Sequence, residues 1–150
     1  MRTSAGILPY RFKDNNLQVY LVYPGGPQHK KNLWGIAKGG IENKDSNKLE
    51  TAKREFKEET SFDPPTELFP IGMIQQRTNK IVYAWAGEQS DLGHPISNEI
   101  EIEVGDRLVT VPEVSDGRYF TVQEALPIMI FGQREFIKNL VDILEKQSKL

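Results

Sequence analysis

The segment KGGIENKDSNKLETAKREFKEETSF, from Lys38 to Phe62, decides the fold of this chain. After the glycine pair, three apolar residues recur at helical spacing: Leu49, Ala52 and Phe56. This period predicts an amphipathic helix whose apolar stripe packs on a core. Asn47 is suited to cap the first turn, with Glu50 three residues later as the partner in a capping box. We therefore expect a helix that begins just after Asn47 and ends near Phe62.

The same helix carries Glu55, Glu58 and Glu59 within a sector of roughly 100°. Arg54 lies one turn after Glu50 and one turn before Glu58, so we expect it to brace both. Like charges at the spacings of the three glutamates repel, and the helix dipole disfavours anions near the C-terminal end, by a few tenths to about 1 kcal/mol each. A hard divalent cation would reverse this balance, because carboxylate oxygens are its preferred ligands. The alternative is a solvated helix face, as for most charge runs. Lys38, Gly39 and Gly40, which we expect in a loop before the helix, favour the first interpretation, because glycine lets main-chain atoms approach a metal ion or a phosphate closely.

This segment resembles the Nudix box of the Nudix hydrolases, G-x5-E-x7-R-E-U-x-E-E-x-G-U, in which U is apolar. Gly39 matches the first glycine and Asp45 stands where the first glutamate is expected. The second half matches in register at Arg54, Glu55, Phe56, Glu58, Glu59 and Phe62. The chain departs from the pattern in having Asp45 for glutamate, one extra residue before Arg54, and Ser61 for the last glycine. No departure removes a carboxylate from the helix, so the resemblance implies an active enzyme.

The resemblance implies a function for several of these residues. The implied ligands of Mg²⁺ or Mn²⁺ are the carboxylates of Glu55, Glu58 and Glu59 and the carbonyl of Gly39. Arg54 would orient the glutamates, and Lys38 and Gly40 would meet the substrate phosphates. A water attacks phosphorus, and a base takes up its proton: either a box glutamate such as Glu58 or the downstream Glu101.

Glu101 lies in Asn98–Val104, where strict alternation puts apolar residues on one face of a strand and glutamates on the other. A half-exposed strand with a charged outer face is one interpretation. The other follows from the resemblance, because the Asn-x-x-Glu-x-Glu pattern is similar to that of a bacterial group of predicted pyrophosphohydrolases, with Glu101 and Glu103 at its acidic positions. Glu113 is a second candidate base, or else an exposed loop carboxylate.

The rest of the chain predicts strands on both sides of the box helix and a second long helix at the end. The expected strands are Ala5–Tyr10, Leu17–Tyr23, Leu68–Gln75, Lys80–Ala86 and Gly117–Phe120; the expected helices are a short one opened by Thr121 and Glu124 and a last one over Gln133–Gln147. This order predicts an α/β fold, with a mixed sheet, in a single domain over residues 1–150. The resemblance implies the Nudix-type α/β/α sandwich.

Three aromatic residues, Trp34, Tyr83 and Trp85, are candidates for stacking on a base, but a role in the core is the simpler interpretation. Lys30 and Lys31 are candidates for phosphate contacts, against the alternative of a solvated loop.

Composition narrows the class of protein further. The 150 residues include no cysteine and only two histidines, which excludes disulfides and makes a zinc site a poor interpretation. A net charge of −2 gives no reason to expect nucleic-acid binding, and no apolar run is long enough for a membrane span. We expect a cytoplasmic protein; its oligomeric state is not determined by the sequence, which allows a homodimer.

The function implied is hydrolysis of a phosphoanhydride in a nucleoside diphosphate linked to another moiety, with nucleoside triphosphates or dinucleoside polyphosphates as the favoured small-molecule substrates. The alternative is a non-catalytic protein that senses a nucleotide on the same scaffold.

Overall fold

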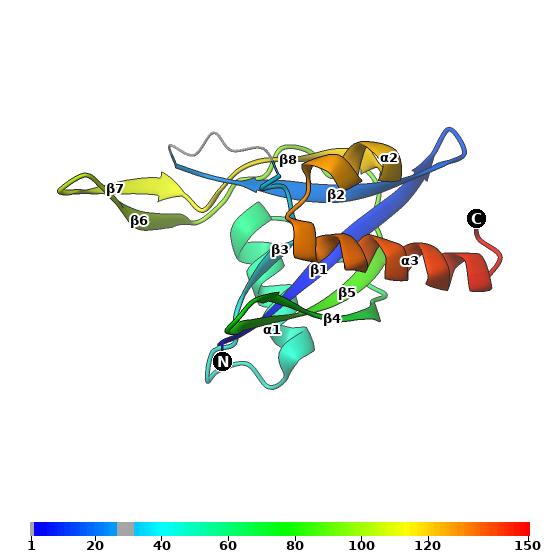
Figure 1. Ribbon diagram of the computed structural model, residues 1–150, viewed down its shortest axis with the longest axis horizontal. Helices are drawn as coiled ribbons and strands as arrows, with labels where there is room; N and C mark the ends of the chain where they lie inside the picture. The colour runs from blue at the N-terminus through cyan, green and yellow to red at the C-terminus, as the bar shows by residue number, and fades with distance from the viewer. Residues whose placement is uncertain (1, 27–31) are drawn as a thin grey trace.

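The computed structural model describes residues 2–26 and 32–150, and its centre is a six-stranded mixed sheet (Figure 1). The strands are β1 (Arg2–Lys13), β2 (Asn16–Pro24), β3 (Ala37–Gly40), β4 (Phe69–Arg77), β5 (Lys80–Glu88) and β8 (Val114–Thr121). Their order is β4-β5-β1-β2-β8, with β3 also paired to β1. Only β1 and β5 run parallel among these pairs.

Strand β1 has two partners along one edge. Its first half, Ser4–Ile7, pairs with β3, and its second half, Tyr10–Lys13, pairs with β2. Strands β2 and β3 therefore pair with β1 at different points along its length and form a fork. An isolated bridge joins Val22 of β2 to Gly35, just before β3. The space that this fork leaves is the site described below.

One helix covers each face of the sheet (Figure 1). Helix α1 (Lys48–Thr60) buries Ala52 and Phe56 against one face, and helix α3 (Arg134–Lys146) buries Phe136 and Leu140 against the other. Two cores therefore lie on opposite sides of the strands, which confirms the predicted α/β/α sandwich with a mixed sheet.

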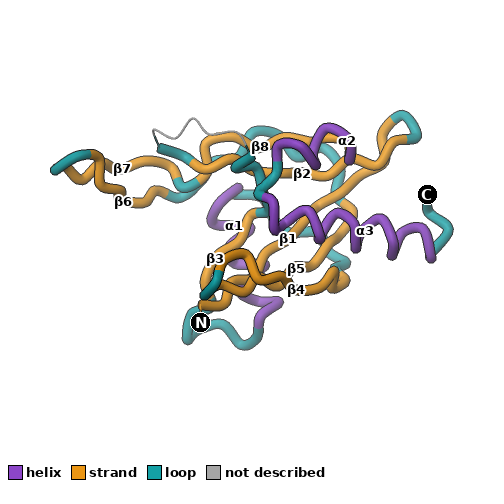
Figure 2. Tube along the Cα trace, in the orientation of Figure 1, coloured by secondary structure: helices purple, strands orange, loops and turns teal. Residues whose placement is uncertain are grey.

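The remaining helical elements are short and lie between β8 and the start of α3 (Figure 2). They are α2 (Val122–Ala125) and two 3₁₀ turns, η1 (Leu126–Ile128) and η2 (Phe131–Gln133). The predicted capping box at the start of α2 is confirmed: the side chains of Thr121 and Glu124 each accept a hydrogen bond from the other's backbone N–H. No helix in the described part of the chain is long and apolar enough to cross a membrane.

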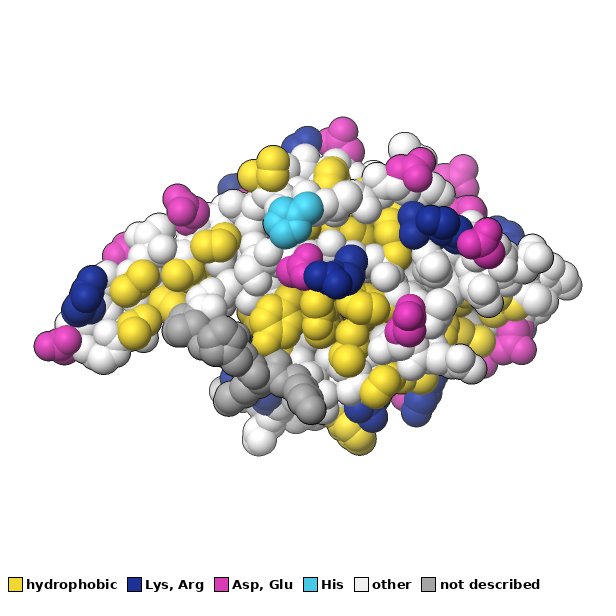
Figure 3. All heavy atoms as spheres, turned by 90° about the horizontal axis from the view of Figure 1, so that it is seen from above, with side chains coloured by type: hydrophobic (Ala, Val, Ile, Leu, Met, Phe, Trp, Pro, Cys, Tyr) yellow, Lys and Arg dark blue, Asp and Glu magenta, His cyan; other side chains and the backbone are white. Residues whose placement is uncertain are grey.

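A separate two-stranded hairpin projects from the body of the protein: β6 (Glu99–Val104) and β7 (Arg107–Pro112) (Figure 1). The sequence predicted β6 but not β7. Apolar side chains gather over this hairpin in Figure 3, and Leu108 on β7 is 67% exposed. Because the hairpin joins no other strand, neither of its faces is covered along its whole length.

The start of the box differs from the prediction. Lys38, Gly39 and Gly40 were expected in a loop, but they form β3, because the first half of β1 leaves an edge free for pairing. Gly6 of β1 makes this approach possible: a Cβ atom there would overlap the carbonyl oxygen of Ala37 and the Cβ of Lys38. The result is a backbone held rigidly beside α1.

The C-terminus of α1 explains the unusual serine of the box. Ser61 adopts the left-handed conformation, with φ 68°, which costs a non-glycine residue about 1 kcal/mol. Its hydroxyl donates a hydrogen bond to the carbonyl oxygen of Ile96, a contact that glycine would not make. The N–H groups of Ile96 and Asn98 in turn donate to the last carbonyls of the helix, those of Thr60 and Glu58. Ser61 therefore helps to fix the segment that leads into β6.

Candidate active site

Arg54 is the hub of the helix face that carries the glutamates. Its Nε and Nη2 atoms donate to Asp45 Oδ1 and Oδ2 at 2.9 and 3.0 Å, as a two-pronged ion pair. Its Nη1 atom donates to Glu55 Oε1 at 2.9 Å and to Glu58 Oε1 at 3.2 Å. Nη2 also reaches the carbonyl oxygen of Gly40 at 3.0 Å, so Arg54 ties the loop, β3 and α1 together.

Asp45 replaces the first glutamate of the box, and its side chain is 4% exposed although its backbone is partly open to solvent. Besides Arg54, it accepts hydrogen bonds from the Thr51 hydroxyl and the Glu42 N–H, both at 2.8 Å. The hydrogen bonds from Arg54 hold the pKa of Asp45 well below its usual range. The shorter side chain therefore serves as an anchor for Arg54.

One predicted contact of Arg54 is wrong. We expected it to brace both Glu50 and Glu58, which lie one turn away on either side. The structure confirms the contact with Glu58, but Glu50 pairs with Lys53 at 3.6 Å instead. Asp45 draws the guanidinium away from Glu50, because a two-pronged pair with a buried carboxylate is stronger than an exposed pair on a helix.

Glycine is required at the first position of the glycine pair by close packing. A Cβ atom on Gly39 would overlap the carboxylate of Glu55, whereas one on Gly40 would meet nothing within 4 Å. Glu55 thus rests directly on the backbone of β3, and only 7% of the residue is exposed.

Glu59 is the most enclosed carboxylate of the site. It is 4% exposed, and its Oε2 atom has no hydrogen-bond partner among the described residues. Burial raises the pKa of Glu59 well above its ordinary value, and the negative charges of Glu113 and Glu55 raise it further. Burial also raises the pKa of Glu55, against the opposing effect of Arg54. Three carboxylates therefore meet where water solvates them poorly.

Glu113 is held in this group by Asn98. The Asn98 Nδ2 atom donates to Glu113 Oε1 at 3.0 Å, and the backbone N–H of Glu113 donates to the Asn98 carbonyl oxygen at 2.9 Å. Asn98 is itself fixed by the bond from its N–H to the carbonyl oxygen of Glu58. A chain of hydrogen bonds thus runs from the end of α1 to Glu113.

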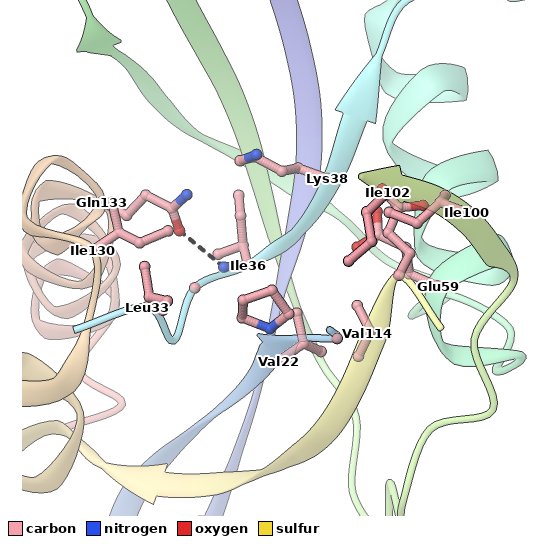
Figure 4. A pocket seen from close by; sticks show the side chains of 14 residues that line it. Val22, Leu33, Ile36, Lys38, Glu59, Ile100, Ile102, Val114, Ile130 and Gln133 are labelled. Atoms are coloured by element: carbon pink, nitrogen blue, oxygen red, sulfur yellow. Dashed lines mark hydrogen bonds between the residues drawn. The ribbon is translucent and has the colours of Figure 1, made fainter. Parts of the chain in front are cut away.

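Glu59 and Glu113 line a pocket of about 270 Å³ in the fork between β2 and β3 (Figure 4). Its walls are aliphatic and come from β2, β3, β6, β8 and the segment before α3; they include Val22, Ile36, Ile102, Val114 and Ile130. Lys38 extends along its upper side, with the ammonium group turned away from Glu59 (Figure 4).

Gln133 supplies the polar group on the opposite wall. It is fully buried, and its Oε1 accepts from the Ile36 N–H at 2.9 Å, as Figure 4 shows. Its Nε2 donates to Gln76 Oε1 at 3.0 Å. Gln133 therefore fixes the wall of the pocket with both ends of its amide.

The aromatic candidates lie elsewhere. Trp34 packs against Tyr23 and Phe120, with ring centroids 5.3 and 4.9 Å away. Tyr83 meets the ammonium group of Lys48, and Trp85 packs at the edge of the core beneath α1. None of the three predicted aromatic residues lines the pocket.

The two candidate bases occupy different places. Ile100 and Ile102 of β6 line the pocket, so alternation turns Glu101 and Glu103 toward the other face of the hairpin. Glu113, the second candidate, is the glutamate that lines the pocket. The role of Glu101 stays a prediction of the resemblance.

The prediction for Lys30 and Lys31 concerns residues outside the described part of the chain. Two residues of the site were not predicted from the sequence. Asn98 and Gln133 were not recognised as parts of the site, because their importance depends on partners 15 to 97 positions away in the sequence.

The donor set suits a hard divalent cation. Within residues 2–26 and 32–150, no three acidic or histidine side chains already converge as a finished metal centre. However, the unpartnered buried oxygen of Glu59 lies among carboxylates that repel one another. Gly39 leaves the space into which Glu55 fits. Oxygen-only donors of this kind match Mg²⁺ or Mn²⁺ better than a softer metal.

Comparison with solved structures reveals close likeness in fold at low sequence identity. The NUDIX domain of Shewanella oneidensis NrtR, complexed with ADP ribose, is 17% identical, with a TM-score of 0.68, covering 96% of this chain and 88% of its own. A Caenorhabditis elegans Ap4A hydrolase in a binary complex is 17% identical, with a TM-score of 0.67, covering 97% of this chain and 99% of its own.

A structure described as a NUDIX hydrolase from Listeria monocytogenes is also 17% identical, with a TM-score of 0.67, and covers 99% of this chain and 97% of its own. Comparison with curated protein sequences finds no match. The sequence model of the NUDIX domain matches residues 1–140. With the box, the sandwich and this match in agreement, the chain belongs to the NUDIX domain family, that of the Nudix hydrolases.

Proposed function

We propose that this protein hydrolyses a phosphoanhydride bond in a nucleoside diphosphate linked to another moiety, with the help of Mg²⁺ or Mn²⁺. The observation that carries this proposal is the buried, unpartnered carboxylate oxygen of Glu59, which lies with Glu113 at the wall of a pocket. A protein has little reason to hold such a group next to other carboxylates unless a cation offsets the cost.

Four groups of this chain would hold the cation: the carboxylates of Glu55, Glu58 and Glu59 and the carbonyl oxygen of Gly39. A bound divalent ion supplies charge that neutralises the pyrophosphate and lowers the pKa of a water. Arg54 positions Glu55 and Glu58 through its hydrogen bonds to both, and Asp45 positions Arg54.

Residues in and beside the pocket would bind the phosphates and take up the proton of the attacking water. Lys38 attracts a phosphate oxygen as a point charge, and the open surface at Gly40 admits the phosphate chain close to the backbone. Glu113 takes up the proton of the attacking water, because Asn98 holds its carboxylate beside the metal-binding glutamates.

Nucleoside triphosphates and dinucleoside polyphosphates are the substrates that we favour. The Ap4A hydrolase of similar fold acts on a dinucleoside polyphosphate, which supports this choice. The NUDIX domain of NrtR is described with ADP ribose, and it supports the alternative of a protein that binds a nucleotide without cleaving it. The full set of carboxylates in the present chain favours hydrolysis.

We expect Mg²⁺-dependent release of phosphate or pyrophosphate and a nucleotide from one substrate class, lost on addition of EDTA. The assay compares nucleoside triphosphates, dinucleoside polyphosphates, ADP-ribose and nucleotide sugars by chromatography of the products. Binding across this panel without cleavage, at any concentration of Mg²⁺ or Mn²⁺, would contradict the proposal and support a sensor.

Gly39→Ala is expected to lower kcat about a hundredfold while the protein stays folded. The added methyl group overlaps the Glu55 carboxylate and must displace it by about 1 Å, a shift that costs roughly that factor in an aligned site. Gly93→Ala is the matched control, because a Cβ there meets nothing within 4 Å. Equal activity of the two variants would show that the position of Glu55 does not matter.

A further inference from the structure

A group of four basic side chains, which we call the basic cluster, lies where three strands end together. Its members are Arg2, Lys38, Arg77 and Lys80. Lys80 begins β5 and is paired on one side with Arg2 of β1 and on the other with Arg77 of β4. Side chains at directly paired positions point to the same face of a sheet, so three cations stand side by side.

Lys38 joins this group from across β1. It is paired with Gly6, whose missing side chain leaves the face of β1 free for the Lys38 Cβ. The Lys38 side chain is near enough for its charge to help lower the pKa of Lys80, although the two residues start from strands on opposite sides of β1. Figure 4 agrees, because the ammonium group of Lys38 points away from Glu59.

The three strand residues of the basic cluster, Arg2, Arg77 and Lys80, take part in no ion pair within the described residues. Lys38 does feel an opposite charge, because it lowers the pKa of Glu59. Burial, together with the charges of Lys38, Arg2 and Arg77, lowers the pKa of Lys80 to about 8. Three cations placed side by side in this way mark a place where an anion gains binding energy.

The basic cluster is continuous with the pocket. Lys38 belongs to both, and Gln133 of the pocket wall is hydrogen-bonded to Gln76, the neighbour of Arg77 on β4. The strand residues of the basic cluster share the α3 face of the sheet, whereas the glutamates of α1 lie on the opposite face, so Lys38 at the pocket is the link between the two groups. A ligand in the pocket that extends past Lys38 therefore reaches the rest of the basic cluster.

We propose that Lys80, with Arg2 and Arg77, forms a second anion subsite that holds the part of a polyphosphate chain beyond the bond to be cleaved. This inference rests on the proposed function and narrows its substrate class to nucleotides with three or more linked phosphates. Nucleotide sugars and ADP-ribose, which carry two phosphates and a neutral sugar, leave the subsite empty.

The direct test measures binding of inorganic tripolyphosphate by calorimetry in EDTA, so that neither catalysis nor a metal ion is needed. We expect Lys80→Gln and Arg77→Gln each to weaken binding about tenfold, and to reduce the dependence of Kd on salt concentration. The matched control is Lys13→Gln, an exposed lysine at the opposite end of β1. Arg77 is exposed, so its variant remains informative if Lys80→Gln fails to fold.

The kinetic counterpart is selectivity. The ratio of kcat/KM for a dinucleoside tetraphosphate to that for ADP-ribose should fall about tenfold in Lys80→Gln, through KM.

Equal tripolyphosphate affinity in wild type and both variants would overturn the subsite, as would an equal loss in Lys13→Gln. Tighter binding of a single-stranded oligonucleotide than of tripolyphosphate would overturn the assignment to substrate and indicate a nucleic-acid surface. The two proposals fail separately: without any hydrolysis, a loss of tripolyphosphate binding in Lys80→Gln still supports the subsite. If the protein hydrolyses its substrate but its affinity for tripolyphosphate is unchanged by both substitutions, only the subsite is refuted.

Discussion

Glu58→Gln is expected to lower kcat by about a thousandfold while leaving the fold intact. This factor corresponds to about 4 kcal/mol of lost transition-state stabilisation, the order expected when a ligand of a catalytic metal ion is removed. The fold should tolerate the change, because the Glu58 side chain is 39% exposed and, among the described residues, its side-chain hydrogen bonds go to Arg54. Arg54 keeps its stronger pair with Asp45 in the variant.

The measurement compares steady-state kinetics, Mg²⁺ affinity and thermal unfolding with those of Glu50→Gln. Glu50 lies on the same helix, and it pairs only with Lys53 on the surface. We expect Glu50→Gln to match wild type in activity, since an exposed ion pair contributes less than about 1 kcal/mol to stability. If Glu58→Gln retains activity within a few fold, Glu58 is not a ligand and the cation is held by Glu55, Glu59 and Glu113.

Local sequence signals predicted the elements that local interactions specify. Asn47 caps α1 through a hydrogen bond from the Glu50 N–H, as the spacing indicated. Thr121 and Glu124 start α2 with the full capping box. The expected reciprocal bond from Glu50 is not formed at α1, because the Glu50 side chain pairs with Lys53. The left-handed conformation at Ser61 was also expected, because it depends on the end of the helix. Each of these features involves residues only a few positions apart.

The rest of the site depends on contacts that a single sequence does not reveal. Nothing near Gly39 in the sequence shows that β1 will offer it an edge and turn a loop into a strand. The partner of Gln133, the N–H of Ile36 just before β3, lies 97 positions away, and the residues around Gln133 in the sequence look like any start of a helix. Periodicity correctly predicted β6, but it did not show which face of the strand meets the pocket. The role given to the glutamates of this strand came from the resemblance alone.

That ambiguity makes the choice of base the most informative remaining question. The resemblance favours Glu101, whereas the geometry favours Glu113, which lines the pocket and is near enough to Glu55 and Glu59 to raise the pKa of both. A general base contributes about 10²- to 10⁴-fold to a rate. We therefore expect Glu113→Gln to lower kcat about a hundredfold, and Glu101→Gln, on the outer face of the hairpin, to stay near wild type.

The pH profile separates a base from a residue that only shapes the site. Loss of the base should make the fall in kcat on the acidic side shallower, because one of the carboxylates that must be ionised during the reaction is gone while Glu55, Glu58 and Glu59 remain. Mg²⁺ affinity, measured by calorimetry, should change less than kcat in Glu113→Gln, since Glu55, Glu58 and Glu59 remain. If Glu101→Gln instead slows the reaction and flattens the acidic limb, the hairpin must fold over the pocket during turnover. Glu101 would then reach the substrate from a strand that, in the present structure, turns it away.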